Sequence, residues 1–217
     1  ISMKGNNKEF PSKGWILAFH PDLICGTPLG LNIHNYTFFS YCPEEALHLS
    51  LREKQIILEF LERIRQELER CIDRHSKKII SKYIELLLDY CTRFYERQFI
   101  TRSEVNKKVF REFNHLLDNH FNVKVSLSTD VLSDEYCANL LHLSPAYFND
   151  LLKYEIGKEF KEYIQFKRFE IAKGWLVNTD KTLGQIAQEL GFSNSQYFSR
   201  LFKKITGCSP NEFRMPN

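Results

Sequence analysis

The chain has 217 residues, of which 43% are hydrophobic and 26% are charged, and its net charge is only +3. This composition is ordinary for a soluble globular protein of one or two domains. Charged residues interrupt the longest apolar runs well before the ~20 residues that a membrane-spanning helix requires, and the charge balance alone does not indicate a nucleic-acid partner. We therefore predict a protein without a membrane segment or a secretory leader, located in the cytoplasm.

Six cysteines are scattered along the chain without a CxxC pair. Three of them, Cys71, Cys91 and Cys137, fall on the apolar stripes of predicted helices, where a free thiol behaves as a small hydrophobic side chain. This pattern favours reduced thiols over disulfides. Four residues of metal-binding types also occur near the N-terminus, at His20, Cys25, His34 and Cys42. Because their spacing is irregular, we predict neither a metal site nor a cofactor.

Two short apolar and aromatic runs, Trp15–His20 and Tyr36–Tyr41, lie between proline and glycine residues near the N-terminus. Their composition predicts two short β-strands. Two such strands cannot form an independent sheet domain. We therefore expect this region to be the remnant of a sensor domain whose earlier strands lie outside this sequence, and no effector can be named from it.

A long amphipathic helix is predicted to begin after Ser50, because Glu53 completes a capping box three residues later. Its apolar residues lie three or four positions apart, which is the spacing of a coiled-coil seam. They are Ile57, Leu61, Ile64, Leu68 and Ile72. A second apolar stripe begins near Ile80, so we predict an antiparallel helix pair. We expect a homodimer contact at Ile57, Leu61, Ile64 and Leu68, although the same stripe could also serve as core within one chain.

The C-terminal half contains one pattern twice, in residues 137–157 and 186–207. The corresponding pairs include Ala138 and Ala187, Phe148 and Phe198, Leu151 and Leu201, Lys153 and Lys203, and Gly157 and Gly207. Each copy predicts a short helix, a tight turn and a longer amphipathic helix that ends at glycine, which is the sequence form of a helix-turn-helix unit. The small alanines are expected where two helices cross closely. The turns are expected to take a positive φ at His142 and Gly191.

Residues 159–177, between the two units, are predicted to form one helix. At ~1.5 Å per residue this helix spans ~28 Å, close to the ~34 Å between successive major-groove faces of B-DNA. The expected fold is mainly α, with a helical dimerisation segment, two helix-turn-helix units joined by a long linker helix, and two short strands near the N-terminus. We assign residues 1–102 to the sensor remnant and dimerisation helices. Residues 103–217 form the DNA-binding domain, with its units at about 132–157 and 182–207.

The most specific stretch is GFSNSQYFSRLFKKITGCSPNEFR, at residues 191–214. Together with Ser-x-x-Tyr-Phe-x-x-Leu-Leu-Lys in the first copy, and with a long helix that carries Arg168 and Ala172, it resembles the DNA-binding domain of AraC/XylS-type transcription regulators. The resemblance covers the chain from about residue 110 to the end. It implies base contacts from Ala146, Asn149, Asp150, Ser195, Gln196 and Arg200. It implies phosphate contacts from Lys153, Ser199, Lys203 and Lys204, and a structural bridging role for Arg168.

Asp150 departs from the family pattern, which often has arginine at that place. An acid there can accept hydrogen bonds from base amino groups, typically that of cytosine, and repels phosphates. The second copy is more basic, because Arg200, Lys203 and Lys204 lie in a stretch without any acid. We therefore expect the second unit to provide more of the phosphate attraction.

Arg200 is the strongest base candidate, since bidentate contacts from arginine to guanine are the most frequent specific contacts. For two others a role without DNA stays open. Gln196 could simply be solvated, and Ser195 could be the N-cap of its helix.

These patterns predict a sequence-specific DNA-binding transcription regulator. Its expected partners are double-stranded DNA, a second copy of the chain and, by resemblance, RNA polymerase. One alternative is an interaction module that binds another regulator instead of DNA. Another is a repair enzyme with a methyl-accepting cysteine, which requires an activated thiolate, but Cys208 has no histidine partner nearby in the sequence. The chain has no Walker loop, GxSxG or HExxH motif, and we predict that it is not an enzyme.

Overall fold

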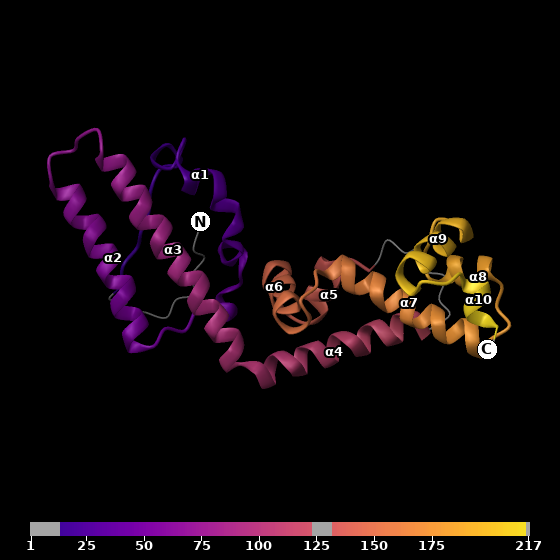
Figure 1. The fold of residues 1–217 in the computed structure, drawn as a ribbon. Helices are drawn as coiled ribbons and strands as arrows, with labels where there is room; N and C mark the ends of the chain where they lie inside the picture. The colour runs from indigo at the N-terminus through magenta and orange to yellow at the C-terminus, as the bar shows by residue number, and fades with distance from the viewer. Residues whose placement is uncertain (1–13, 123–131, 216–217) are drawn as a thin grey trace. The chain divides into compact units, whose positions relative to one another are not determined.

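The computed structural model describes residues 14–122 and 132–215 (Figure 1). The chain divides into two compact units. Of the described residues, the first unit comprises 14–35 and Leu49–Cys91, and the second comprises Tyr36–His48, 92–122 and 132–215. This division falls inside one long helix. The predicted domain boundary after residue 102 falls instead between that helix and the next, and it stays a prediction.

The described α-helices are α1 (Pro28–Asn32), α2 (Leu51–Glu69), α3 (Ser76–Thr101), α4 (Ser103–Asn122), α5 (Asp134–Leu140), α6 (Pro145–Ile156), α7 (Phe160–Asn178), α8 (Leu183–Glu189), α9 (Ser195–Thr206) and α10 (Pro210–Arg214). The described 3-10 helices are η1 (Pro21–Leu23), η2 (Ile33–Asn35), η3 (Thr37–Ser40) and η4 (Pro43–Glu45). In both units the described core is therefore built from helix–helix packing.

The two predicted strands are wrong, because the described residues contain no β-strand. Trp15–His20 has no regular secondary structure, and Tyr36–Tyr41 contains the 3-10 helix η3. A short apolar run does not by itself distinguish a strand from another packed segment. The aromatic rings of Tyr36–Tyr41 pack on helices and not on a neighbouring strand. Phe38 stacks on Tyr95 of α3 with ring centroids 5.4 Å apart.

In the N-terminal unit, α2 and α3 run antiparallel (Figure 1). The capping box predicted at the start of α2 is confirmed, since Ser50 and Glu53 each accept the other's backbone N–H. At the far end of the pair, the Ser76 hydroxyl donates to Glu67 at 3.0 Å. Ile64 in α2 is only 4% exposed, so this member of the predicted dimer seam packs within the chain.

Helix α7 contributes to two of the aromatic cores of the described C-terminal unit. Phe160, Tyr163 and Ile164, from the first half of α7, pack with buried residues of α4, α5 and α6. Phe169, Ala172 and Leu176, from the second half, pack with buried residues of α8 and α9. One helix therefore supports both helix-turn-helix units, which agrees with the linker predicted from the sequence.

Candidate nucleic-acid interface

The first helix-turn-helix unit consists of α5 and α6. Ser133 caps α5 and Ser144 caps α6, each through a side-chain oxygen that accepts a backbone N–H three residues later. Pro145 occupies the first turn of α6, where its missing N–H has no cost. The turn takes a φ of 57° at His142, the only positive φ outside glycine in the described residues. This confirms the left-handed conformation predicted there.

The second unit, α8 and α9, repeats this geometry. Gly191 has a φ of 73°, as predicted. The Phe192 N–H donates to the Ala187 carbonyl at 2.8 Å, and the equivalent bond runs from the Leu143 N–H to the Ala138 carbonyl at 2.9 Å. The two turns are therefore closed by the same hydrogen bond, although the sequences around them differ.

The helix crossings and the helix ends also match between the units. Ala138 and Ala187 are 0% and 1% exposed, which confirms the close crossing expected at these positions. Both longer helices end at a left-handed glycine, Gly157 and Gly207. Together with the matching turns, these ends establish that the repeat seen in the sequence is a repeat in structure.

The surface of α9 presents several of the predicted contact residues to solvent. Gln196, Arg200, Lys203 and Lys204 are exposed, and Ser195 and Ser199 are half-buried. The Ser199 hydroxyl donates to the Ser195 carbonyl at 2.8 Å. The N-cap of α9 is Asn194, whose side chain accepts the Tyr197 N–H at 2.7 Å. Ser195 is thus the first helical residue, and the N-cap interpretation of Ser195 is wrong.

The corresponding residues of α6 have partners within the protein. The Asn149 amide donates to the carboxylate of Asp134 and to the Pro145 carbonyl, both at 3.0 Å. Asp150 accepts a hydrogen bond from the Tyr41 hydroxyl at 2.8 Å. Lys153 pairs with Glu159 at 3.0 Å. The small side chain of Ala146 is half-buried beside them.

Two residues of this region have no counterpart in the sequence-based prediction. Tyr41 and Glu45 lie about a hundred positions before α6 in the chain, yet they contact Asp150 and Ser144 directly. No periodic pattern connects them with the repeat. The sequence offered one clue, which was an acid at Asp150, where a cation is usual in the family that the chain resembles.

Arg168 lies half-buried on α7. Burial lowers the pKa of its guanidinium, and its Nε is buried without a hydrogen-bond acceptor. The pKa of His120 on α4 is lowered, mainly by burial and secondly by the positive charge of Arg168. Arg168 is therefore next to the helix that supports the first unit, while its bridging role stays a prediction.

Two of the cysteines, Cys91 and Cys137, are poorly suited to act as nucleophiles. Burial raises the pKa of the Cys91 and Cys137 thiols to about 11 each, which disfavours the reactive thiolate. Cys71 follows the end of α2 and is exposed, so its predicted place on an apolar helix stripe is wrong. Among the described residues no group of three or more His, Cys, Asp or Glu side chains could hold a metal ion.

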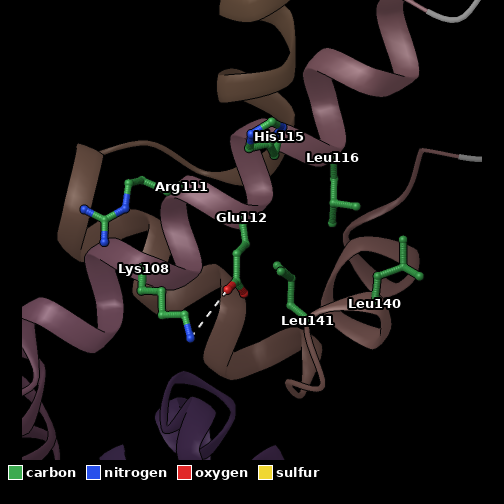
Figure 2. A pocket seen from close by; sticks show the side chains of 7 residues that line it. All are labelled: Lys108, Arg111, Glu112, His115, Leu116, Leu140 and Leu141. Carbon is green, nitrogen blue, oxygen red and sulfur yellow. Dashed lines mark ion pairs between the residues drawn. The ribbon is translucent and has the colours of Figure 1, made fainter.

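An open groove lies between α4 and the end of α5 (Figure 2). Its lining consists of Lys108, Arg111, Glu112, His115, Leu116, Leu140 and Leu141. Lys108 and Glu112 pair across one turn of α4 at 3.9 Å. These side chains give the groove both charged and apolar surface. No helix in the described part of the chain is long and apolar enough to span a membrane.

Comparison with known proteins gives a family match in the C-terminal part of the chain. A family model described as a helix-turn-helix domain matches residues 137–215. The chain is 33% identical over 111 residues to the uncharacterized HTH-type transcriptional regulator YtdP of Bacillus subtilis, covering 51% of this chain and 14% of YtdP.

Two further relatives have more specific names. One is the bifunctional transcriptional activator/DNA repair enzyme AdaA of B. subtilis, 41% identical over 86 residues, covering 40% of this chain and 41% of AdaA. The other is the arabinose operon regulatory protein of Salmonella typhimurium, 32% identical over 101 residues, covering 46% and 32%. The chain thus spans less than half the length of these curated relatives.

Among solved structures, the C-terminal domain of AraT, a response regulator from Geobacillus stearothermophilus, is 32% identical. The match covers 49% of this chain and 83% of that one, with a TM-score of 0.42. The sequence matches and the equivalent geometry of the two units point to the same family. The C-terminal part of the chain is therefore an AraC-type helix-turn-helix DNA-binding domain, and its relatives are regulators of the AraC/XylS family.

Proposed function

We propose that the chain is part of a sequence-specific transcription regulator that places α6 and α9 in adjacent major-groove segments of double-stranded DNA. The observation that carries this proposal is the pair of equivalent helix-turn-helix units supported by one linker helix, α7. Nineteen helical residues span ~28 Å, which is near one turn of B-DNA.

In this proposal the two helix-turn-helix units differ in how strongly they bind DNA. On α9, Ser195, Gln196 and Arg200 contact bases, while Ser199, Lys203 and Lys204 contact phosphates. On α6, Ala146, Asn149 and Asp150 contact bases, and Lys153 contacts a phosphate. The described part of α9 has three exposed cations and no acid, so it provides most of the attraction to the DNA backbone.

The salt dependence of DNA binding tests this proposal. Each neutralised phosphate releases counterions, so the logarithm of the binding constant should fall linearly with the logarithm of the salt concentration, with a slope of about −0.9 per phosphate contact. Three or four lysine and arginine contacts predict a slope near −3. A slope near zero would favour the alternative function, an interaction module of a regulator that does not itself bind DNA.

We also propose that the N-terminal unit forms a homodimer through α2. Leu68 is 56% exposed and Ile72, just beyond α2, is 76% exposed, and such apolar surface is commonly covered by a partner. Leu61 and Ile57 are half-buried and would flank the contact, whereas Ile64 belongs to the core of one chain. Sedimentation at two protein concentrations checks this, because a purely monomeric chain would rule the dimer out.

The wider cellular role follows from the relatives. The name of AdaA includes a transcriptional activator, which supports RNA polymerase as a further partner, and such a role would be carried out in the cytoplasm. No cofactor enters the proposed function.

A further inference from the structure

The segment Tyr36–His48, here called the strap, packs against α6 through η3. The Tyr41 hydroxyl donates to Asp150 at 2.8 Å, and the Tyr41 ring lies edge-on to Tyr147 with centroids 5.1 Å apart. Burial, and then the nearby carboxylate of Asp150, raise the pKa of Tyr41. The phenol therefore stays protonated and remains a donor to Asp150.

Glu45 occupies the N-terminal end of α6 and is only 4% exposed. Its carboxylate accepts the Ser144 N–H at 2.7 Å and the Ser144 hydroxyl at 2.5 Å. The Cys42 N–H, within the strap, donates to the same carboxylate at 2.8 Å. The free N–H groups and the dipole of a helix N-terminus favour an anion, so the strap supplies an anion where a DNA phosphate would also be favoured.

The strap is also tied to the end of α3, through contacts that do not involve α6. The Gln98 side chain, 2% exposed, accepts the His48 N–H at 2.8 Å and donates to the Ala46 carbonyl at 3.2 Å. Arg97 donates to the His48 carbonyl at 2.7 Å. These bonds can persist when the contacts to α6 open, so the two sides of the strap can be tested separately.

We propose that the strap is an autoinhibitory element that competes with DNA for the N-terminal part of α6. Tyr41 and Glu45 hold Asp150 and Ser144, so the first unit contacts bases only after these bonds open, whereas α9 carries no such cover in the described residues. Apparent DNA affinity is then reduced by the fraction of molecules in which the strap is bound.

The strap connects at both ends to the N-terminal unit, at Asn35 and Leu49. A change in that unit, such as binding of an effector or a second copy, can therefore alter the strap through the backbone. This inference rests on the proposed function, because it requires α6 to be a DNA-contacting helix.

The double variant Tyr41→Phe with Glu45→Gln tests the competition. It removes the hydrogen bond to Asp150 and weakens the charged bonds to Ser144, while the ring packing of residue 41 is kept. The affinity for a duplex selected from random sequence, measured by fluorescence anisotropy, should increase roughly tenfold. The reason is that the variant loses hydrogen bonds to charged groups that stabilise the state in which the strap covers α6. Glu44→Gln is the matched control, because Glu44 is exposed in the same 3-10 helix and its loss changes the charge equally. Equal affinities for Glu44→Gln and the double variant would overturn the proposal.

Amide hydrogen exchange of the wild-type protein gives a second readout, independent of whether the variants fold. Saturating duplex should release the Glu45 carboxylate from Ser144 and expose it to water, which should speed exchange at the Cys42 amide that donates to it. The His48 amide, which donates to Gln98, should be unchanged. If the Cys42 amide keeps its protection from exchange in the complex while amides along α6 become newly protected, α6 binds DNA with the strap in place. That result would overturn the strap proposal and leave the proposed function standing. If no duplex binds the wild type or any variant, the proposed function fails, and the strap proposal fails with it.

Discussion

Arg200→Ala is expected to weaken binding of the selected duplex by about 5- to 150-fold, which corresponds to ~1–3 kcal/mol, and to abolish discrimination at one base pair. Arg200 is exposed on α9, with its guanidinium 5.7 Å from the centroid of the Tyr197 ring. Because the residue is exposed, the guanidinium donors are open to a base edge. Two parallel donors match the O6 and N7 acceptors of guanine.

Two control variants separate base contact from charge. Arg200→Lys keeps the charge but loses the planar fork, so it should recover affinity without recovering discrimination. Lys204→Ala should weaken binding to all duplexes alike and reduce the salt slope by about one. If Arg200→Ala instead lowers the affinity for every duplex by the same factor, Arg200 is a phosphate contact.

Phe198→Ala should lower the free energy of unfolding of the C-terminal unit by ~3–5 kcal/mol, the usual cost of removing a fully buried phenyl group. Phe198 is 0% exposed, and its ring centroid lies 5.2 Å from Phe192, 5.6 Å from Phe202 and 6.3 Å from Phe169 of α7. The substitution opens a cavity between α9 and its support, so DNA binding by the second unit should be lost as well.

Denaturant unfolding followed by circular dichroism measures this cost. Ile205→Ala is the matched control, because Ile205 lies on the same helix and is 52% exposed. It should change stability by less than ~1 kcal/mol. Similar losses from the two variants would contradict the described packing of α9.

The repeat and its turns could be predicted from the sequence because they depend on local chemistry. A left-handed turn residue, a capping side chain and a buried alanine can each be recognised from the residues within a few positions. The second copy of the pattern supports the prediction made from the first. This is why His142, Gly191, Ala138 and Ala187 were identified correctly. The N-cap of α9 was missed because Asn194 and Ser195 are adjacent and both residue types are good caps.

The N-terminal region could not be predicted because its conformation depends on distant partners. The run Tyr36–Tyr41 has strand-like composition, yet no strand pairs with it in the described residues. Instead its aromatic rings pack on α3 and α6. The contacts of Tyr41 and Glu45 with α6 span about a hundred residues of chain, a separation at which a single sequence carries no pairing signal.

Hydroxyl-radical footprinting on a selected duplex, at saturating protein, tests most directly whether the two units bind side by side. The expected result is two protected segments about one helical turn (~10 base pairs) apart on one face of the duplex, with Phe198→Ala, which disrupts the second unit, removing protection from only one of them. A single protected segment, in both the wild type and the variant with Tyr41→Phe and Glu45→Gln, would contradict the paired arrangement.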